Sequence, residues 1–291
     1  MENHQRFGFS PISRRRRLEM PGGARIAVWV IPNIEHFHFD KPSTSITPIT
    51  AHLKPDVLNY AWRDFGNRVG VWRLMDIMER HGFKGTAALN AEVCEYYPEI
   101  IDAGNKLGWE WMAHGRTNSE LLNGQSEEQE RVIVKSVVDT IALGTGVKPK
   151  GWLGPALTES HNTPDILAEN GIEYLCDWCN DEQPYEFNVR NGKLISVPYS
   201  IEVNDIPAFL DRGMSPEQFG QMIVDQFDVL YADGERNPRI MAVCLHPFLI
   251  GHGFRAKYLE KAFEYISKKE KVWISTGGEI SDWYYENYTG K

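Results

Sequence analysis

The sequence predicts an α/β fold built on a parallel sheet, either open or closed into a barrel. Short apolar runs rich in β-branched residues alternate with longer amphipathic segments from one end of the chain to the other. That alternation is typical of parallel strands joined by helices. The chain has 291 residues and shows no internal repeat and no linker-like segment, so we expect one domain over residues 21–291 after a tail over residues 1–20.

The predicted strands are short apolar runs that end at turn residues or polar residues. The clearest is the run ARIAVWVIPN, residues 24–33, which is buried in character and ends at Pro-Asn. Further strands are predicted within residues 85–91, 109–115, 149–155, 173–185, 194–205, 238–247 and 272–280.

The predicted helices repeat apolar residues at helical spacing and carry recognisable ends. They span residues 68–82, 97–108, 126–146, 162–172, 215–234 and 257–270. Ser126 and Ser215 are the expected N-caps of the two longest, and Pro216 stands at a first helical position. Residues 34–66 contain three prolines and look irregular, and a loop of that length is usually functional or disordered.

Charge and hydropathy exclude several classes of function. The net charge of −9 disfavours nucleic-acid binding, and we interpret the basic run at residues 13–17 as a solvated arm or a subunit contact. No apolar run approaches the 18 residues of a membrane span, and the N-terminus lacks the apolar core of a signal peptide. We therefore expect a cytoplasmic protein with no membrane partner.

Chemistry in parallel α/β folds collects at the carboxyl ends of the strands. Glu35 follows the first predicted strand, His114 follows the third, and His246 follows the strand at 238–247. If these strands belong to one barrel, a carboxylate and two imidazoles converge, which indicates a hydrolytic site. Other polar or aromatic residues near the same ends are candidates for binding substrate: Asn33, His36, Asn118, Trp152, Asp177, Trp178, Asp181 and Phe248.

Over about residues 20–285 the chain carries an ordered set of motifs: PGGARIAV leading to NIEH, then DFGNRVGVWRLMDIMERHG, HGRTN, GWLGP, CDWCNDEQPY and LHPFLIGHGFR. This order of motifs resembles the polysaccharide deacetylase superfamily. It implies a NodB-homology fold, which is a distorted (β/α) barrel of about seven mainly parallel strands. Within the superfamily the chain is most similar to cofactor-independent allantoinases and cyclic imide hydrolases, and this branch implies a homo-oligomer, a tetramer or dimer.

The chain departs from the metal-dependent deacetylases at three motifs. NIEH replaces the two aspartates of the first motif, so either Glu35 is the base and His36 a ligand, or Asn33 takes the base position and Glu35 is the ligand. Asn118 replaces a histidine ligand of the second motif, and Gly154 replaces an arginine of the third. His246 retains the histidine of the last motif.

These departures leave the metal open and favour a metal-free site. A zinc-type ion would take Glu35, His36, His114 and Asn118, but zinc prefers imidazole, thiolate and carboxylate to an amide. Without an ion, Glu35 and His114 hold and activate a water while His246 protonates the departing nitrogen.

This chemistry suits a substrate whose nitrogen leaves readily. We therefore predict hydrolysis of C–N bonds in small cyclic amides: imides, hydantoin-like rings or allantoin. Two other functions stay open. One is a metal-dependent N- or O-deacetylase of a sugar or polysaccharide, and the other is a binding protein that has lost catalysis.

Overall fold

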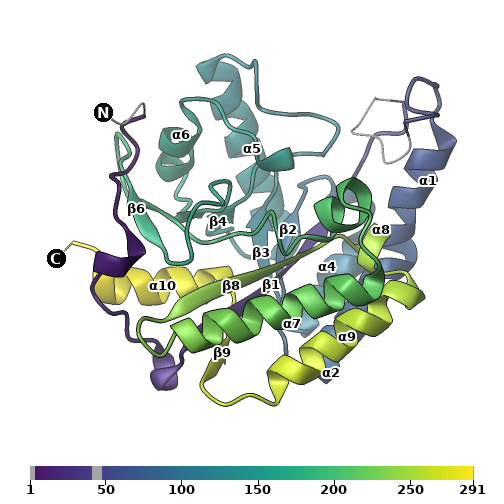
Figure 1. The fold of residues 1–291 in the computed structure, drawn as a ribbon. Helices are drawn as coiled ribbons and strands as arrows, with labels where there is room; N and C mark the ends of the chain where they lie inside the picture. The colour runs from purple at the N-terminus through teal and green to yellow at the C-terminus, as the bar shows by residue number, and fades with distance from the viewer. Residues whose placement is uncertain (1–3, 41–47, 291) are drawn as a thin grey trace.

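The computed structural model describes residues 4–40 and 48–290, and it contains a curled, mostly parallel sheet (Figure 1). Nine strands join in the order β6-β7-β5-β4-β3-β2-β1-β8, and β9 also pairs with β1. Every pair is parallel except β6 with β7. The strands are β1 (Ile26–Ile34), β2 (Thr86–Leu89), β3 (Glu110–Ala113), β4 (Gly151–Trp152), β5 (Tyr174–Leu175), β6 (Tyr185–Phe187), β7 (Leu194–Ser196), β8 (Arg239–Leu245) and β9 (Val272–Ile274). The prediction of a distorted barrel of mainly parallel strands is confirmed, with nine strands where about seven were expected.

Helices alternate with the strands along most of the chain. They are α1 (Val57–Phe65), α2 (Val71–Arg80), α3 (Val93–Tyr96), α4 (Pro98–Lys106), α5 (Glu127–Thr145), α6 (Thr163–Glu169), α7 (Pro216–Asp233), α8 (Pro247–Ile250), α9 (Gly253–Ser267) and α10 (Gly277–Tyr288). Ser126 and Ser215 cap α5 and α7 through capping boxes, as the sequence predicts. The segment 34–66 was expected to be irregular throughout, but it contains α1, which Asp56 caps by accepting the backbone N–H of Asn59.

The two faces of β1 pack into different cores because side chains alternate along a strand. Ile26, Val28 and Val30 face outward into a layer formed with α2, α4, α5, α6, α7 and α9. Trp29 and Ile31 face inward, into a core formed by the other strands and α10. The same alternation continues beyond the end of β1, and it selects which residues enter the candidate site.

Helix α10 closes the amino-terminal end of the barrel, and no helix was expected there from the sequence. Ile280 and Trp283 pack into the inner core. The first turn of α10 donates backbone N–H groups, from Gly277 to Thr86 and from Gly278 to Glu110. With this end closed, the carboxyl ends of the strands are left for chemistry.

The sheet does not close between its edge strands β6 and β8, and irregular segments cover this seam. The N–H of Ile240 donates to the carbonyl of Glu182 at 2.9 Å, and that of Cys244 donates to the carbonyl of Val203 at 3.0 Å. The predicted tail also lies along the barrel, since Leu18 is buried. Among the described residues, no helix is long and apolar enough to cross a membrane.

Candidate active site

The carboxylate of Glu35 lies between two imidazoles at the carboxyl end of the barrel. Its Oε1 is 3.5 Å from Nε2 of His114, which follows β3, and 3.7 Å from Nε2 of His246, which follows β8. All three side chains are buried. The structure thus brings together the three residues for which catalytic roles were predicted.

Asn118 contacts the same carboxylate through its amide nitrogen, and the hydrogen bonds around it fix this orientation. The backbone N–H of His36, which can only donate, donates to Oδ1 of Asn90 at 2.8 Å. Asn90 therefore presents its Nδ2 to the other side, where it donates to Oδ1 of Asn118 at 2.9 Å and to the carbonyl of His114. Asn118 is left to donate its own Nδ2 to Glu35 Oε1.

The backbone fixes the tautomer of His114. Its Nδ1 lies 2.7 Å from the carbonyl oxygen of Leu153. A carbonyl can only accept, so the proton sits on Nδ1 and Nε2 faces Glu35. The backbone thus engages Nδ1 and leaves Nε2 as the ring atom that can interact with the carboxylate of Glu35.

Asp205 supports His246 from behind. This fully buried carboxylate accepts the backbone N–H of His246 at 2.9 Å and the ring Nδ1–H at 2.7 Å. Burial lowers the pKa of His246, but the charge of Asp205, its hydrogen bond and the charge of Glu35 together raise that pKa above its usual value. His246 is therefore held as an acid, with its Nε2–H directed at the cavity.

Glu35 is held ionised. Burial raises its pKa, but hydrogen bonding to His114 and the charges of His246, His114 and Arg63 outweigh burial and bring the pKa below its ordinary value. The site thus combines a carboxylate with an imidazole whose protonated form the surroundings favour.

Arg63, on α1, brings a further cation to this cavity. Burial lowers the pKa of its guanidinium to about 10, against the opposing charges of Glu35 and Asp56, so it stays charged at neutral pH. The guanidinium lies over the ring of Phe37, 4.0 Å from the ring centre, which fixes its position.

The cavity around these groups is small and mostly apolar. Its volume is about 280 Å³. The apolar walls are Phe37, Leu121, Leu153, Pro155, Ala156, Leu157, Tyr199, Ile201, Ile206, Pro207, Leu210 and Phe248. The polar lining is Asn33, Glu35, Arg63, His114, Asn118, Asn204 and His246.

Three of the residues predicted to bind substrate line this cavity: Asn33, Asn118 and Phe248. Asn33 donates its Nδ2 to the carbonyl of Leu245 at 3.1 Å, which joins the ends of β1 and β8. The ring of Phe248 lies 5.5 Å from that of His246, so it forms a wall beside this imidazole.

His36 does not line the cavity. Along the extended chain Asn33, Glu35 and Phe37 share the inward face, and His36 points to the other side. There its Nδ1 lies 2.8 Å from Glu92 Oε2. The first of the two alignments of NIEH, with Glu35 as base and His36 as ligand at the same site, is therefore wrong.

Trp152 also faces away from the cavity. It is fully buried in the outer core, because β4 turns Leu153, and not Trp152, inward. Trp152 was expected to bind substrate because it ends a strand, but its side chain lies on the outer face of that strand, away from the cavity.

Asp177 and Trp178 lie behind the cavity wall. Asp177 accepts the backbone N–H of Gly154 at 2.7 Å and lies against the carboxyl of Glu159. Trp178 donates its indole N–H to Glu159 at 2.9 Å and packs on Phe7 of the tail. These two residues support the 154–158 turn that lines the cavity, and neither lines it.

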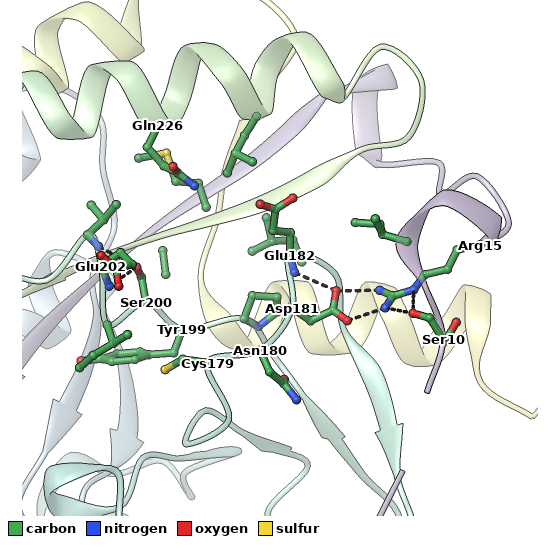
Figure 2. A pocket seen from close by; sticks show the side chains of 18 of the residues that line it. Ser10, Arg15, Cys179, Asn180, Asp181, Glu182, Tyr199, Ser200, Glu202 and Gln226 are labelled. Carbon is green, nitrogen blue, oxygen red and sulfur yellow. Dashed lines mark hydrogen bonds and ion pairs between the residues drawn. The ribbon is translucent and has the colours of Figure 1, made fainter. Parts of the chain in front are cut away.

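Asp181 lies at a second hollow, a groove of about 610 Å³ over the seam between β6 and β8. Figure 2 shows its carboxylate bound to both terminal nitrogens of Arg15, at 2.7 and 2.6 Å. Tyr199 and Ile201 separate this groove from the cavity, since both residues line both hollows. Asp181, predicted to bind substrate, therefore lies outside the cavity that holds Glu35, His114 and His246.

The sequence analysis missed three residues of the site: Asp205, Arg63 and Tyr199. Strand alternation points to Tyr199, because Ile195 and Val197 before it face the inner core. Asp205 lies in the connection after β7, and Arg63 lies in the segment expected to be irregular. No periodic pattern marks either of them.

The comparisons with known proteins agree with the fold. Residues 61–175 match the family model described as polysaccharide deacetylase. The crystal structure of a probable polysaccharide deacetylase from Pseudomonas aeruginosa PAO1 superposes with a TM-score of 0.85 at 26% identity, over 95% of this chain and 96% of the other. The chain thus resembles polysaccharide deacetylases over residues 61–175 and shares their NodB-like fold.

Two further relatives show how wide the similarity is. A peptidoglycan deacetylase from Helicobacter pylori strain 26695 is 26% identical over 254 residues, covering 75% of this chain and 84% of the relative. The crystal structure of PuuE allantoinase has the same fold, with a TM-score of 0.84 at 24% identity over 95% of both chains.

Deacetylases of this superfamily often use a divalent metal, but the residues at the centre of this domain's cavity do not fit one. Two nitrogens bound to one zinc ion at 2.0–2.1 Å lie at most about 4.2 Å apart. Within the described residues, the one group of three donors that all lie within 4.8 Å of one another is His36, His38 and Glu92. Glu35, His114 and His246 are not such a group, although each imidazole lies within 3.7 Å of Glu35. The imidazole nitrogens of His114 and His246 are therefore more than 4.8 Å apart, which is too far for both to bind one zinc ion. Asn118 also turns a donor, not a ligand oxygen, toward this place.

Proposed function

We propose that this deacetylase-like chain hydrolyses a C–N bond in a small cyclic amide, such as an imide, a hydantoin-like ring or allantoin. The observation that carries the proposal is the cavity itself. It has about 280 Å³ of space, apolar walls, and Glu35 held between His114 and His246. A small planar ring suits that volume and lining better than a hydrophilic sugar chain.

The reaction follows from the protonation states. A water that contacts Glu35 and His114 loses a proton to the carboxylate as its oxygen attacks the ring carbonyl. His246 then gives its Nε2 proton to the ring nitrogen as the C–N bond breaks, and Asp205 stabilises the imidazolium before that transfer. The products are a carboxyl group and an amide or urea nitrogen on the same opened molecule. Such acid–base groups contribute roughly 10² to 10⁴-fold each.

The leaving group explains why this site suits a cyclic imide or ureide. The nitrogen of an imide or ureide lies between electron-withdrawing carbonyls, so it departs with modest help from a general acid. The nitrogen of an N-acetyl sugar departs as an alkylamine and needs stronger polarisation of the carbonyl, which a bound metal usually supplies. The fold shared with PuuE allantoinase is consistent with a ureide substrate, although at 24% identity it is a likeness of fold.

Deacetylation of a peptidoglycan or polysaccharide is the second candidate function. The family model and the Helicobacter pylori relative favour it by name. It requires the chain to admit one acetamido group of a polymer into a cavity that is narrow and apolar.

A substrate panel separates the two candidates. Purified enzyme, with and without EDTA dialysis, is incubated with allantoin, succinimide, dihydrouracil, an N-acetylglucosamine oligomer and peptidoglycan. We expect ring opening of at least one cyclic substrate, which mass spectrometry detects as a gain of one water. We expect this activity to persist after EDTA dialysis. Release of acetate from either polymer, with every ring intact at high enzyme concentration, would overturn the proposal.

A further inference from the structure

Three potential metal ligands lie together outside the active-site cavity, on the opposite face of the segment that carries Glu35. Nδ1 of His36 is 2.8 Å and Nε2 of His38 is 2.7 Å from the same oxygen, Oε2 of Glu92. The three donor atoms all lie within 4.8 Å of one another. We propose that these residues form a binding site for a divalent transition-metal ion of the zinc type, separate from the catalytic cavity.

The donor set has the right chemistry for such an ion. Two imidazole nitrogens and one carboxylate oxygen are ligands that zinc prefers, with a fourth position left to water. Tetrahedral ligands at about 2.0–2.1 Å from zinc lie roughly 3.3 Å apart. The nitrogens of His36 and His38 lie 2.8 and 2.7 Å from Glu92 Oε2, so small side-chain movements away from that oxygen make room for the ion.

The ligands are also held in place by their surroundings. Arg116 donates its Nε to the other oxygen of Glu92, Oε1, at 2.9 Å, so Oε2 stays directed at the histidines. The ring of Tyr96 stacks on His36, with centres 4.5 Å apart and planes 17° from parallel. The backbone N–H of His38 donates to the hydroxyl of Ser119 at 2.9 Å. Such outer contacts orient ligands and raise metal affinity.

Solvent reaches the carboxylate of this site. Glu92 lines a surface hollow of about 340 Å³ whose lining also includes Glu95 and Glu120. These further carboxylates attract a cation toward Glu92 and partly offset the charge of Arg116.

A bound ion would fasten the segment that carries two residues of the cavity. His36 and His38 flank Phe37, and Glu35 precedes them. We therefore expect the ion to stabilise the folded chain without taking part in the chemistry, because it lies behind the catalytic carboxylate.

The test is metal binding by the full chain after EDTA dialysis. Calorimetric titration with ZnCl₂ should show one equivalent bound with a Kd of about 10 µM or tighter, and the melting temperature should rise by at least about 2 °C with excess zinc. Substitution of Co²⁺ should give the visible absorption of a tetrahedral nitrogen–oxygen site, without a thiolate band.

Variants locate the ion. His38→Gln and Glu92→Gln keep hydrogen-bonding capacity and should each weaken zinc binding at least 10-fold, whereas His114→Ala, in the cavity, should bind as wild type does. Absence of saturable zinc binding in wild type would overturn the proposal. Loss of binding in His114→Ala with retention in His38→Gln would also overturn it, by placing the ion at the catalytic residues. Hydrolysis is measured separately, so either result leaves the proposed function standing.

Discussion

Asn118 donates a hydrogen bond from its side-chain nitrogen to the carboxylate of Glu35. In the motif of the metal-dependent deacetylases a histidine at this position binds the metal ion through a lone pair. Asn118 instead presents an N–H donor at this position. Asn90 enforces this orientation, because its own amide is fixed by the backbone N–H of His36. An ionised Glu35 is thereby stabilised by a neutral donor.

Replacing that donor by an acceptor should impair the enzyme. In Asn118→Asp, a second carboxylate faces Glu35, and two like charges in one buried site raise the pKa of one of them. We expect kcat/KM at neutral pH to fall roughly 10 to 100-fold. At acidic pH, where one of the two carboxylates is protonated, KM should be lower and kcat/KM should partly recover. Asn191→Asp, at an exposed bend, adds the same charge and should leave the kinetics unchanged. Equal kinetics of the two variants would mean that the hydrogen bond from Asn118 to Glu35, which Asn90 orients, does not matter for catalysis.

Glu35 should be indispensable for turnover. Glu35→Gln keeps the size of the side chain and removes the base, so kcat should fall by at least roughly 10²-fold while KM changes little. The matched control is Glu99→Gln on the exposed face of α4. Steady-state kinetics on the ring substrate found by the panel measure both, and an active Glu35→Gln enzyme would remove Glu35 from the mechanism.

Asp205→Asn should shift the pH profile as well as the rate. His246 must be protonated to act as an acid, so activity falls as pH rises through the pKa of His246, which Asp205 helps to raise. Removing the carboxylate lowers that pKa and moves the descending limb of kcat/KM to lower pH. We also expect kcat to fall roughly 10² to 10⁴-fold, as in other His–carboxylate pairs.

The control for this prediction is Asp211→Asn at the exposed end of the π-helical segment Pro207–Asp211. Circular dichroism confirms that Asp205→Asn is folded before its profile is measured. A lower rate with an unshifted descending limb would mean that Asp205 acts only as a structural support.

Glu159 should make the fold less stable as pH rises. Burial raises the pKa of Glu159 to about 7, and it lies against Asp177, whose pKa burial and the charge of Glu159 raise well above the ordinary value. Oδ2 of Asp177 is buried without an N–H donor, so a proton shared with Glu159 satisfies it. The folded state then binds more protons than the unfolded chain between pH 4.5 and about 7, and stability falls as pH rises across that window.

Glu159→Gln should remove this slope. The amide still accepts the indole N–H of Trp178 and can donate to Asp177 without a shared proton. In urea unfolding, the loss of stability of wild type between pH 5 and pH 7.5, on the order of 3 kcal/mol from this group, should shrink in the variant. Glu186→Gln, on the surface, should keep the slope of wild type, and an unchanged slope in Glu159→Gln would exclude a shared proton.

The sequence by itself determined the architecture and the centre of the site. Alternating strands and helices dictate a parallel sheet, and the caps at Ser126 and Ser215 follow from local hydrogen bonding alone. Glu35, His114 and His246 were found because they end strands, and strand ends converge in any such sheet. Strand alternation, applied more strictly, also separates Glu35 from His36 and Leu153 from Trp152, since successive side chains face opposite sides.

Only the tertiary structure decided the chemical state of these residues. Asp205 stands 41 positions before His246, and its contact with the imidazole depends on how the seam beside β8 folds. The sequence does not say whether the amide of Asn118 donates to Glu35 or accepts a hydrogen bond there. The backbone N–H of His36 decides it, because it orients Asn90, which in turn orients Asn118. Helix α10 and the pairing of β6 with β7 likewise depend on burial against distant strands. Local pattern fixes which residues reach the end of the barrel, and long-range packing fixes their partners, because hydrogen-bond direction and charge depend on neighbours that are remote along the chain.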